Sequence, residues 1–163
     1  MIARKRFGQH FLEPAWVEKL VRAIDPAADQ TFLEIGPGRG ALTRPLAARA
    51  RHVLAFEIDR DLVAELRAAA ISNLTVLSGD FLDVSAGQLT HELAAAGAAG
   101  APPGAGRSSG PIRVAGNLPH NVASPSLFQL VDLFGAGVPL ADATVMLQRE
   151  VADRLTAAPG TGD

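Results

Sequence analysis

The chain alternates short continuous apolar runs with longer stretches in which apolar residues recur every three or four positions. The continuous runs are typical of buried parallel strands and fall at 32–35, 52–56, 74–77, 112–116 and 143–147. The stretches with helical spacing lie at 14–24, 43–51, 60–70, 85–95, 124–134 and 148–156. In the first of these helices, Trp16 is expected to pack into the core. This alternation predicts an α/β fold with a doubly wound, mostly parallel sheet and flanking helices.

Three glycines follow the first predicted strand, at Gly36, Gly38 and Gly40. Glycine permits positive φ and lets a ligand lie against bare backbone, and amide groups at the following helix start can face a polar or anionic group. The spacing differs from the G-x-G-x-x-G pattern of dinucleotide-binding proteins. A tight turn without a ligand is the alternative interpretation.

Carboxylates stand where the second and third strands end, at Glu57 and Asp80. An acidic residue about 20 positions after a glycine turn is placed to accept hydrogen bonds from ribose hydroxyls. NAD and S-adenosylmethionine (SAM) both satisfy this pattern. Asp80 can accept a hydrogen bond from an adenine amine and Phe81 can cover a ring, although an ordinary helix cap is the alternative for Asp80.

The fourth strand continues into Asn117-Leu118-Pro119-His120. The Asn117 side-chain oxygen can accept one proton of an aromatic amine, and Pro119 fixes the backbone so that the Leu118 carbonyl can accept the other. Holding both N–H groups in this way would localise the nitrogen lone pair and direct it at an electrophile. A common turn is the alternative interpretation of Asn-x-Pro.

Composition limits the class of protein. With 163 residues and 48% hydrophobic content, one domain is expected, and the absence of cysteine excludes disulfides and thiolate metal sites. No apolar run reaches the roughly 18 residues that span a bilayer, so we expect a soluble cytoplasmic protein without a membrane or metal partner. The net charge of −2 excludes a globally basic nucleic-acid binder. Low-complexity residues 96–111 predict a mobile loop inserted before the fourth strand.

Several motifs together closely resemble the ribosomal RNA adenine dimethyltransferases. They occur in the order of that family and are Arg4-Lys5-Arg6-Phe7-Gly8-Gln9-His10-Phe11-Leu12, the loop from Glu34 to Gly40, Phe56-Glu57-Ile58-Asp59, Gly79-Asp80-Phe81, Gly116-Asn117-Leu118-Pro119 and Met146-Leu147-Gln148-Arg149-Glu150-Val151-Ala152. The resemblance covers almost the whole chain except 96–111. The first and last motifs favour the branch that acts on the small subunit over the antibiotic-resistance enzymes of the large subunit.

The resemblance implies a Rossmann-like methyltransferase sheet and SAM-dependent N6,N6-dimethylation of two adjacent adenines near the 3′ end of small-subunit rRNA. The substrate would be the immature small ribosomal subunit and the enzyme a monomer. The implied catalytic residues are Asn117, Leu118, Pro119 and His120. The implied SAM-binding residues are Gln9, His10, Leu12, Gly36, Gly38, Glu57, Ile58, Asp80, Phe81 and Asn117. The cations Arg4, Lys5 and Arg6 are expected to contact RNA phosphates, with a solvated arm as the alternative.

Two features depart from the family pattern. His120 stands where the family usually has Tyr or Phe, which stacks on the flipped target base. The family also continues into further strands and a helical domain, so we expect a sheet that is incomplete at its C-terminus and a truncated member. These departures keep open a SAM- and RNA-binding assembly factor with weak catalysis. An NAD-dependent oxidoreductase is the third hypothesis, opposed by the glycine spacing and the Asn-Leu-Pro box.

Overall fold

The computed structural model describes residues 12–99 and 110–158 and contains one five-stranded parallel sheet. The order across the sheet is β3-β2-β1-β4-β5. The strands are β1 (Thr31–Ile35), β2 (His52–Glu57), β3 (Leu74–Ser78), β4 (Ile112–Asn117) and β5 (Leu140–Met146). β1 therefore lies between its sequence neighbour β2 and the distant β4. This arrangement confirms the predicted doubly wound α/β fold.

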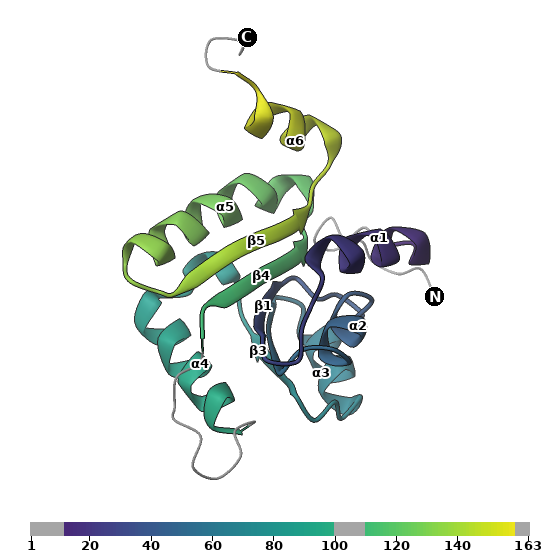
Figure 1. Ribbon diagram of the computed structural model, residues 1–163, viewed down its shortest axis with the longest axis vertical. Coiled ribbons are helices and arrows are strands. Elements are labelled where there is room, and N and C mark those ends of the chain that lie inside the picture. The colour runs from purple at the N-terminus through teal and green to yellow at the C-terminus, as the bar shows by residue number, and fades with distance from the viewer. Residues whose placement is uncertain (1–11, 100–109, 159–163) are drawn as a thin grey trace.

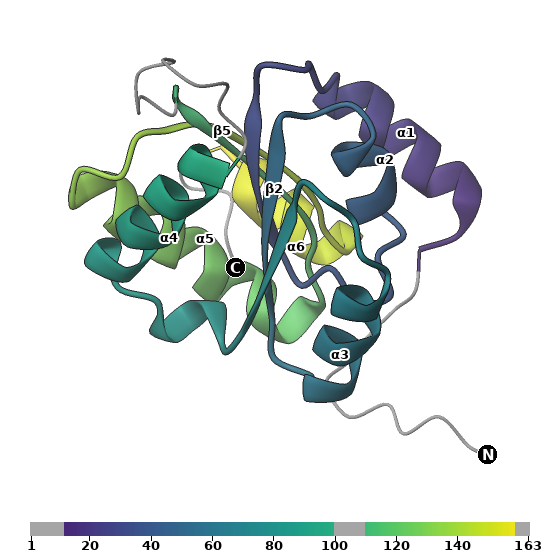
Figure 2. The same cartoon turned by 90° about the horizontal axis from the view of Figure 1, so that it is seen from below.

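Helices cover both faces of the sheet. α1, α2 and α3 lie on one side, and α4 and α5 lie on the other (Figures 1 and 2). α6 follows β5 and extends past the end of that strand (Figure 1). The helices of the described residues, with the 3-10 turn η1, are α1 (Pro14–Ile24), α2 (Thr43–Ala47), α3 (Arg60–Ala68), η1 (Phe81–Asp83), α4 (Ala86–Ala99), α5 (His120–Gly135) and α6 (Arg149–Thr156).

The central strand β1 is buried along its whole length because helices pack on both of its faces. Its alternate residues enter two cores. Leu33 and Ile35 belong to the cluster that contains residues of α4 and α5, while Phe32 belongs to the cluster that contains residues of α1 and α2. The parallel register pairs Ile35 with Phe56 of β2 and with Gly116 of β4. The carboxyl ends of three adjacent strands therefore meet at one edge.

The helix boundaries differ most from the prediction in α5, α4 and α2. α5 begins at His120, four residues earlier than expected, because Pro119 takes the extended N-cap position and its carbonyl accepts hydrogen bonds from Val122 N and Ala123 N. α4 continues to Ala99, since its alanine-rich end has a high helix propensity. α2 is shorter than predicted and ends at Ala47. The rest of the predicted loop, 100–109, lies outside the described residues.

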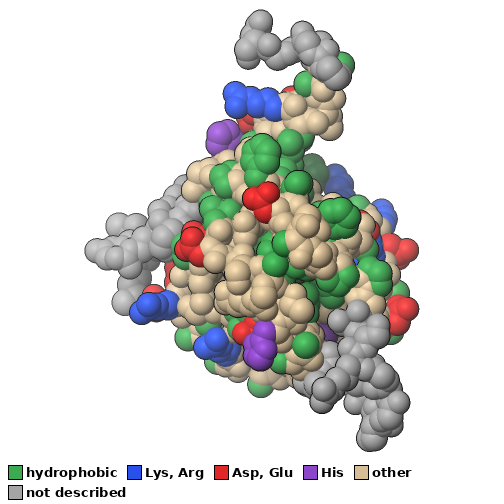
Figure 3. All heavy atoms as spheres, turned by 90° about the vertical axis from the view of Figure 1, so that its left-hand side faces the viewer, with side chains coloured by type: hydrophobic (Ala, Val, Ile, Leu, Met, Phe, Trp, Pro, Cys, Tyr) green, Lys and Arg blue, Asp and Glu red, His purple; other side chains and the backbone are tan. Residues whose placement is uncertain are grey.

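The prediction that Trp16 packs into the core is wrong. Its side chain is 50% exposed, whereas Leu20, Val21 and Ile24 form the buried face of α1. Trp16 lies in the first turn of α1, where its ring borders a cavity instead of the sheet. Figure 3 shows further hydrophobic atoms at the surface on the side that carries α4 and α5, where Phe128 is 72% exposed.

Candidate functional site

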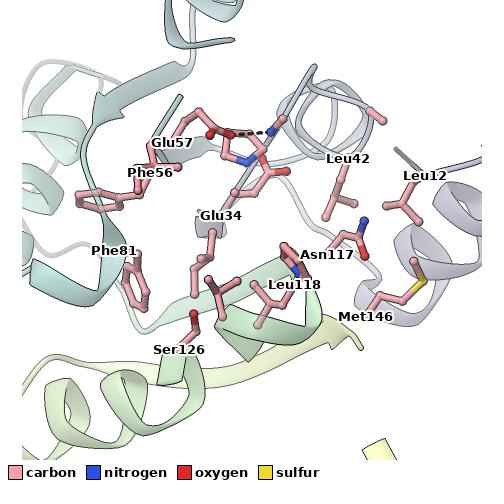
Figure 4. A pocket seen from close by; sticks show the side chains of 18 of the residues that line it. Leu12, Glu34, Leu42, Phe56, Glu57, Phe81, Asn117, Leu118, Ser126 and Met146 are labelled. Atoms are coloured by element: carbon pink, nitrogen blue, oxygen red, sulfur yellow. Dashed lines mark hydrogen bonds between the residues drawn. The ribbon is translucent and has the colours of Figure 1, made fainter. Parts of the chain in front are cut away.

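A cavity of about 610 Å³ opens at the carboxyl edge of the sheet. This volume lies within the range of small-molecule and cofactor sites, and the position is where open α/β sheets bind ligands. Figure 4 shows Phe56 and Phe81 on one side, Leu12, Met146 and Asn117 on the other, and Glu34 between them. Of the predicted site residues, those lining the cavity are Leu12, Gly36, Gly38, Glu57, Ile58, Asp80, Phe81, Asn117, Leu118 and Pro119.

The glycine turn presents open backbone to this cavity. Gly36 and Gly38 have φ values of +66° and +57°, and a Cβ added at either position would meet no heavy atom within 4 Å. Gly40 serves packing instead, because its Cβ would approach Leu66 Cδ2 to 2.8 Å. The first two glycines therefore leave space for a ligand, and the third allows the turn to pack against α3.

Glu57 connects the glycine turn to the end of β2. Its Oε2 accepts a hydrogen bond from Gly38 N at 2.9 Å, and its Oε1 accepts one from Asp59 N at 3.0 Å. The side chain is buried and also lines the cavity. A carboxylate has about four acceptor sites, so Glu57 keeps capacity for a ligand hydroxyl after these two bonds.

Asp80 and Phe81 form an adjacent part of the wall. Asp80 Oδ1 accepts a hydrogen bond from Leu82 N at 3.0 Å, so this carboxylate caps η1 as well as lining the cavity. Phe81 is buried and contacts Phe56 edge to face, with ring centroids 5.9 Å apart. The two rings make an apolar surface beside a carboxylate, an arrangement suited to a heteroaromatic ring with an exocyclic amine.

Asn117 is the last residue of β4. The preceding residue, Gly116, allows this end of β4 to lie close to β1. A Cβ at Gly116 would lie 2.9 Å from the Ile35 carbonyl oxygen, so only glycine fits against β1 here. Leu118 N donates to Met146 O at 3.0 Å. Because helical hydrogen bonding in α5 starts at the Pro119 carbonyl, the Leu118 carbonyl stands outside that ladder.

His120 is exposed at the start of α5 and does not line the cavity. Five predicted residues lie outside the described part of the chain: Gln9 and His10 of the cofactor set, and the cations Arg4, Lys5 and Arg6. Within 12–99 and 110–158, no group of acidic or histidine side chains could hold a metal ion. No helix there is long and apolar enough to cross a membrane.

Glu34 is a site residue that the sequence analysis did not predict. It is 1% exposed, lines the cavity, and its Oε2 has no hydrogen-bond partner among the described residues. Burial raises the pKa of Glu34 to about 8, and the Glu57 carboxylate adds to this shift. The nearby Thr43 hydroxyl opposes it, although Thr43 Oγ1 also lacks a hydrogen-bond partner. The signal in the sequence that could have identified Glu34 is that an acidic residue lies within an otherwise apolar predicted strand.

Comparison with known proteins points to one family. A family model described as ribosomal RNA adenine dimethylase matches residues 2–163. The chain is 48% identical to ribosomal RNA small subunit methyltransferase A of Bordetella pertussis and 45% identical to the protein of that name from Polaromonas naphthalenivorans. Each match covers 99% of this chain and, respectively, 53% and 57% of the relative. The chain thus spans a little over half the length of these relatives.

Solved structures agree with the sequence comparison. A dimethyladenosine transferase from Plasmodium falciparum superposes with a TM-score of 0.67 and 26% identity, covering 91% of this chain and 47% of that one. The 23S rRNA methyltransferase ErmE superposes with a TM-score of 0.64 and 27% identity, and the match covers 89% of this chain and 50% of ErmE.

Proposed function

The chain belongs to the ribosomal RNA adenine dimethylase family, and from that premise we propose that it is the catalytic domain of a SAM-dependent enzyme that dimethylates N6 of adenine in ribosomal RNA. The observation that carries the proposal is that Glu57, Asp80 and Asn117, from three separate strand ends, border one cavity. We place the substrate in the small subunit because two relatives bear the name ribosomal RNA small subunit methyltransferase A, and we extend the proposal to two adjacent adenines near the 3′ end of its rRNA because the motifs resemble those of the adenine dimethyltransferases.

The cavity residues fit SAM. Glu57 would accept from the ribose hydroxyls, Asp80 from the adenine amine, and Phe81 would pack on the adenine ring. The open backbone at Gly36 and Gly38 admits the rest of the cofactor, since an added Cβ meets nothing within 4 Å. The unpartnered Glu34 Oε2 places a potential negative charge in the wall of a cavity that would receive a cation. Gln9 and His10 complete the proposed cofactor set, together with Leu12 and Ile58.

In the transfer step, the chain orients the target amine. The Asn117 side-chain oxygen and the Leu118 carbonyl would each accept one N6–H, and Pro119 would hold that carbonyl outside the helix. When bound, SAM would supply a methyl group on a positively charged sulfur; N6 would form the new N–C bond, and the sulfur would keep the electron pair of the broken S–C bond. The N6 proton is then lost to solvent, so no strong base is needed. His120, which follows Pro119 at the exposed start of α5, would stack on the target base, and Arg4, Lys5 and Arg6 would contact phosphates.

The first experiment tests the cofactor site by calorimetry. Glu57→Ala should weaken SAM binding by about 1.5–3 kcal/mol, the range for hydrogen bonds to a charged group. Phe128→Ala is expected to leave SAM affinity unchanged and serves as a control for general damage, because Phe128 is exposed and does not line the cavity. A folded Glu57→Ala protein with wild-type affinity would contradict the assignment.

The second experiment separates turnover from binding by following methyl transfer from labelled SAM to immature small ribosomal subunits. Asn117→Ala should lose most transfer, because removing one preorganised hydrogen-bonding partner costs about 2.7–4 kcal/mol of barrier. His120→Phe should keep or raise activity and His120→Ala should lower it. If the wild-type chain bound SAM and RNA but transferred no methyl group, the binding-factor hypothesis would replace the enzyme.

A further inference from the structure

Trp16 is a large exposed ring that the proposed cofactor site does not use. It is half exposed, whereas Phe56 and Phe81, the aromatic residues at the opposite side of the cavity, are buried. Lys19, one helical turn later, places its Nζ 4.2 Å from the centre of the Trp16 ring. An exposed aromatic ring paired with an ammonium group offers a planar surface and a positive charge at one point.

The pair formed by Trp16 and Lys19 lies on α1, next to the cavity that contains the proposed cofactor site. Trp16 lines the cavity and lies four residues after Leu12, in the first turn of α1, and Figure 4 shows Leu12 and Met146 across the cavity from Phe56 and Phe81. Since Asn117 lies on the side of Leu12 and Met146 (Figure 4), a ligand that reaches Asn117 from that side does not pass over the proposed adenine pocket of the cofactor. Trp16 belongs to the helix that begins shortly after Leu12, on this side of the cavity.

The chemistry of Trp16 and Lys19 indicates which kind of ligand they can bind. Every nucleobase has a flat π-face that stacks on an indole ring, and proteins that hold unpaired strands combine such rings with cations that contact the backbone. Lys19 covers one part of the indole and remains exposed itself, so it can reach a phosphate beside a stacked base. Glu13 lines the cavity three residues before Trp16, and its charge disfavours a phosphate on that side.

We propose that Trp16 and Lys19 form a stacking site for an unpaired nucleotide of the RNA substrate, adjacent to the adenine that enters the cavity. The inference rests on the proposed function and adds to it a contact on α1. It assigns Trp16 to the base of the neighbouring nucleotide and Lys19 to its phosphate.

The composition of the chain gives a direct test. Trp16 is the only tryptophan, and the chain has no tyrosine, so the intrinsic emission reports this one position. The full chain, saturated with SAM, is titrated with a short unpaired RNA that contains two adjacent adenines. Stacking should quench the Trp16 emission along a saturable curve. RNA binding that leaves the emission unchanged would overturn the proposal, as would the absence of RNA binding.

Variants are then compared by the anisotropy of labelled RNA. Trp16→Ala should weaken binding about fivefold or more, the lower end of the effect of removing a base-stacking ring, while Trp16→Phe should retain most of the affinity. Lys19→Gln should reduce the dependence of binding on salt, and Lys19→Arg should restore it. Phe128→Ala is the matched control, because Phe128 is also an exposed aromatic residue but does not line the cavity. Equal losses in Trp16→Ala and Phe128→Ala would count against a specific site.

Calorimetry with SAM distinguishes this inference from the function on which it rests. If Trp16→Ala weakens SAM binding and leaves RNA binding intact, Trp16 belongs to the cofactor wall and the stacking site is wrong. If SAM binds normally and the Trp16 emission does not respond to RNA, the inference fails and the proposed function stands. If the wild-type chain does not bind SAM, the proposed function itself fails.

Discussion

Replacing Glu34 by Gln should change how the stability of this protein depends on pH. The carboxyl group is buried in β1, and its pKa is raised from 4.5 to about 8 by burial first and by Glu57 second. The folded state therefore holds a proton that the unfolded chain releases above pH 4.5. The stabilisation linked to this proton is complete below pH 4.5 and is lost as the pH rises through 8.

The magnitude follows from the two pKa values. Between pH 5 and pH 8, the wild-type free energy of unfolding should fall by about 3 kcal/mol through Glu34 alone, at 1.36 kcal/mol per pKa unit. Glu34→Gln has no such proton. The amide that replaces the carboxyl group changes the free energy of unfolding by an amount that does not vary between pH 5 and pH 8. The pH dependence of the difference in unfolding free energy between the two proteins therefore reports the Glu34 carboxyl group.

The assay is urea unfolding followed by circular dichroism at pH 5, 6, 7 and 8 for both proteins. Titrating groups that do not interact with Glu34, including His52, whose pKa is lowered by burial and by Arg51, are common to both proteins and cancel in the difference. The variant should gain stability relative to the wild type as the pH rises. A difference that stays constant within about 0.5 kcal/mol from pH 5 to pH 8 would refute the reasoning, since it would mean that Glu34 is solvated or ionised throughout.

Three further outcomes are expected. Saturating SAM should reduce the pH dependence of the difference between wild type and Glu34→Gln, because a cation in the cavity favours the Glu34 carboxylate; the same unfolding series with ligand checks this. Gly116→Ala should destabilise by about 1–3 kcal/mol in urea unfolding, because its Cβ meets the Ile35 carbonyl oxygen, whereas Gly87→Ala in the open first turn of α4 should not destabilise. Asn73→Ala should cost about 1–2 kcal/mol in the same measurement, since the Asn73 side chain donates to the carbonyls of Ala47 and Ala50. Asn73→Asp should restore none of that loss.

The fold could be predicted from the sequence because the apolar runs are unbroken and the glycine turn marks the first crossover. The strand ends carrying Glu57, Asp80 and Asn117 could be placed at one edge for the same reason. Helix ends were predicted less well. The start of α5 was missed because Asn117-x-Pro119 is typical of a turn, whereas Pro119 takes the N-cap position of the helix.

Two residues show what the linear pattern cannot indicate. Trp16 fits the apolar stripe of α1, but a helical period does not reveal that the first turn lies beside a cavity and not above the sheet. Glu34 stands out in the sequence as a charge within a strand, but its lost hydrogen bonding and raised pKa depend on Glu57 and Thr43, which lie on other elements. The pKa of Glu34 is raised first by burial in the folded protein and further by Glu57, while Thr43 opposes the shift, so these properties arise from tertiary structure.

The position of β1 at the centre of the sheet also has a consequence for folding. β1 pairs with β2 about 20 residues later, but its other edge pairs with β4, where Phe32 lies opposite Arg113. Closing the long loop between Phe32 and Arg113 carries an entropic cost before the pairing of β1 with β4 contributes any stability. Such long-range contacts slow folding. The chain between β2 and β4 must therefore be synthesised before the second edge of β1 is covered. Since Asn117 closes β4, a ligand that needs this residue binds only after that late pairing and stabilises the completed sheet by mass action.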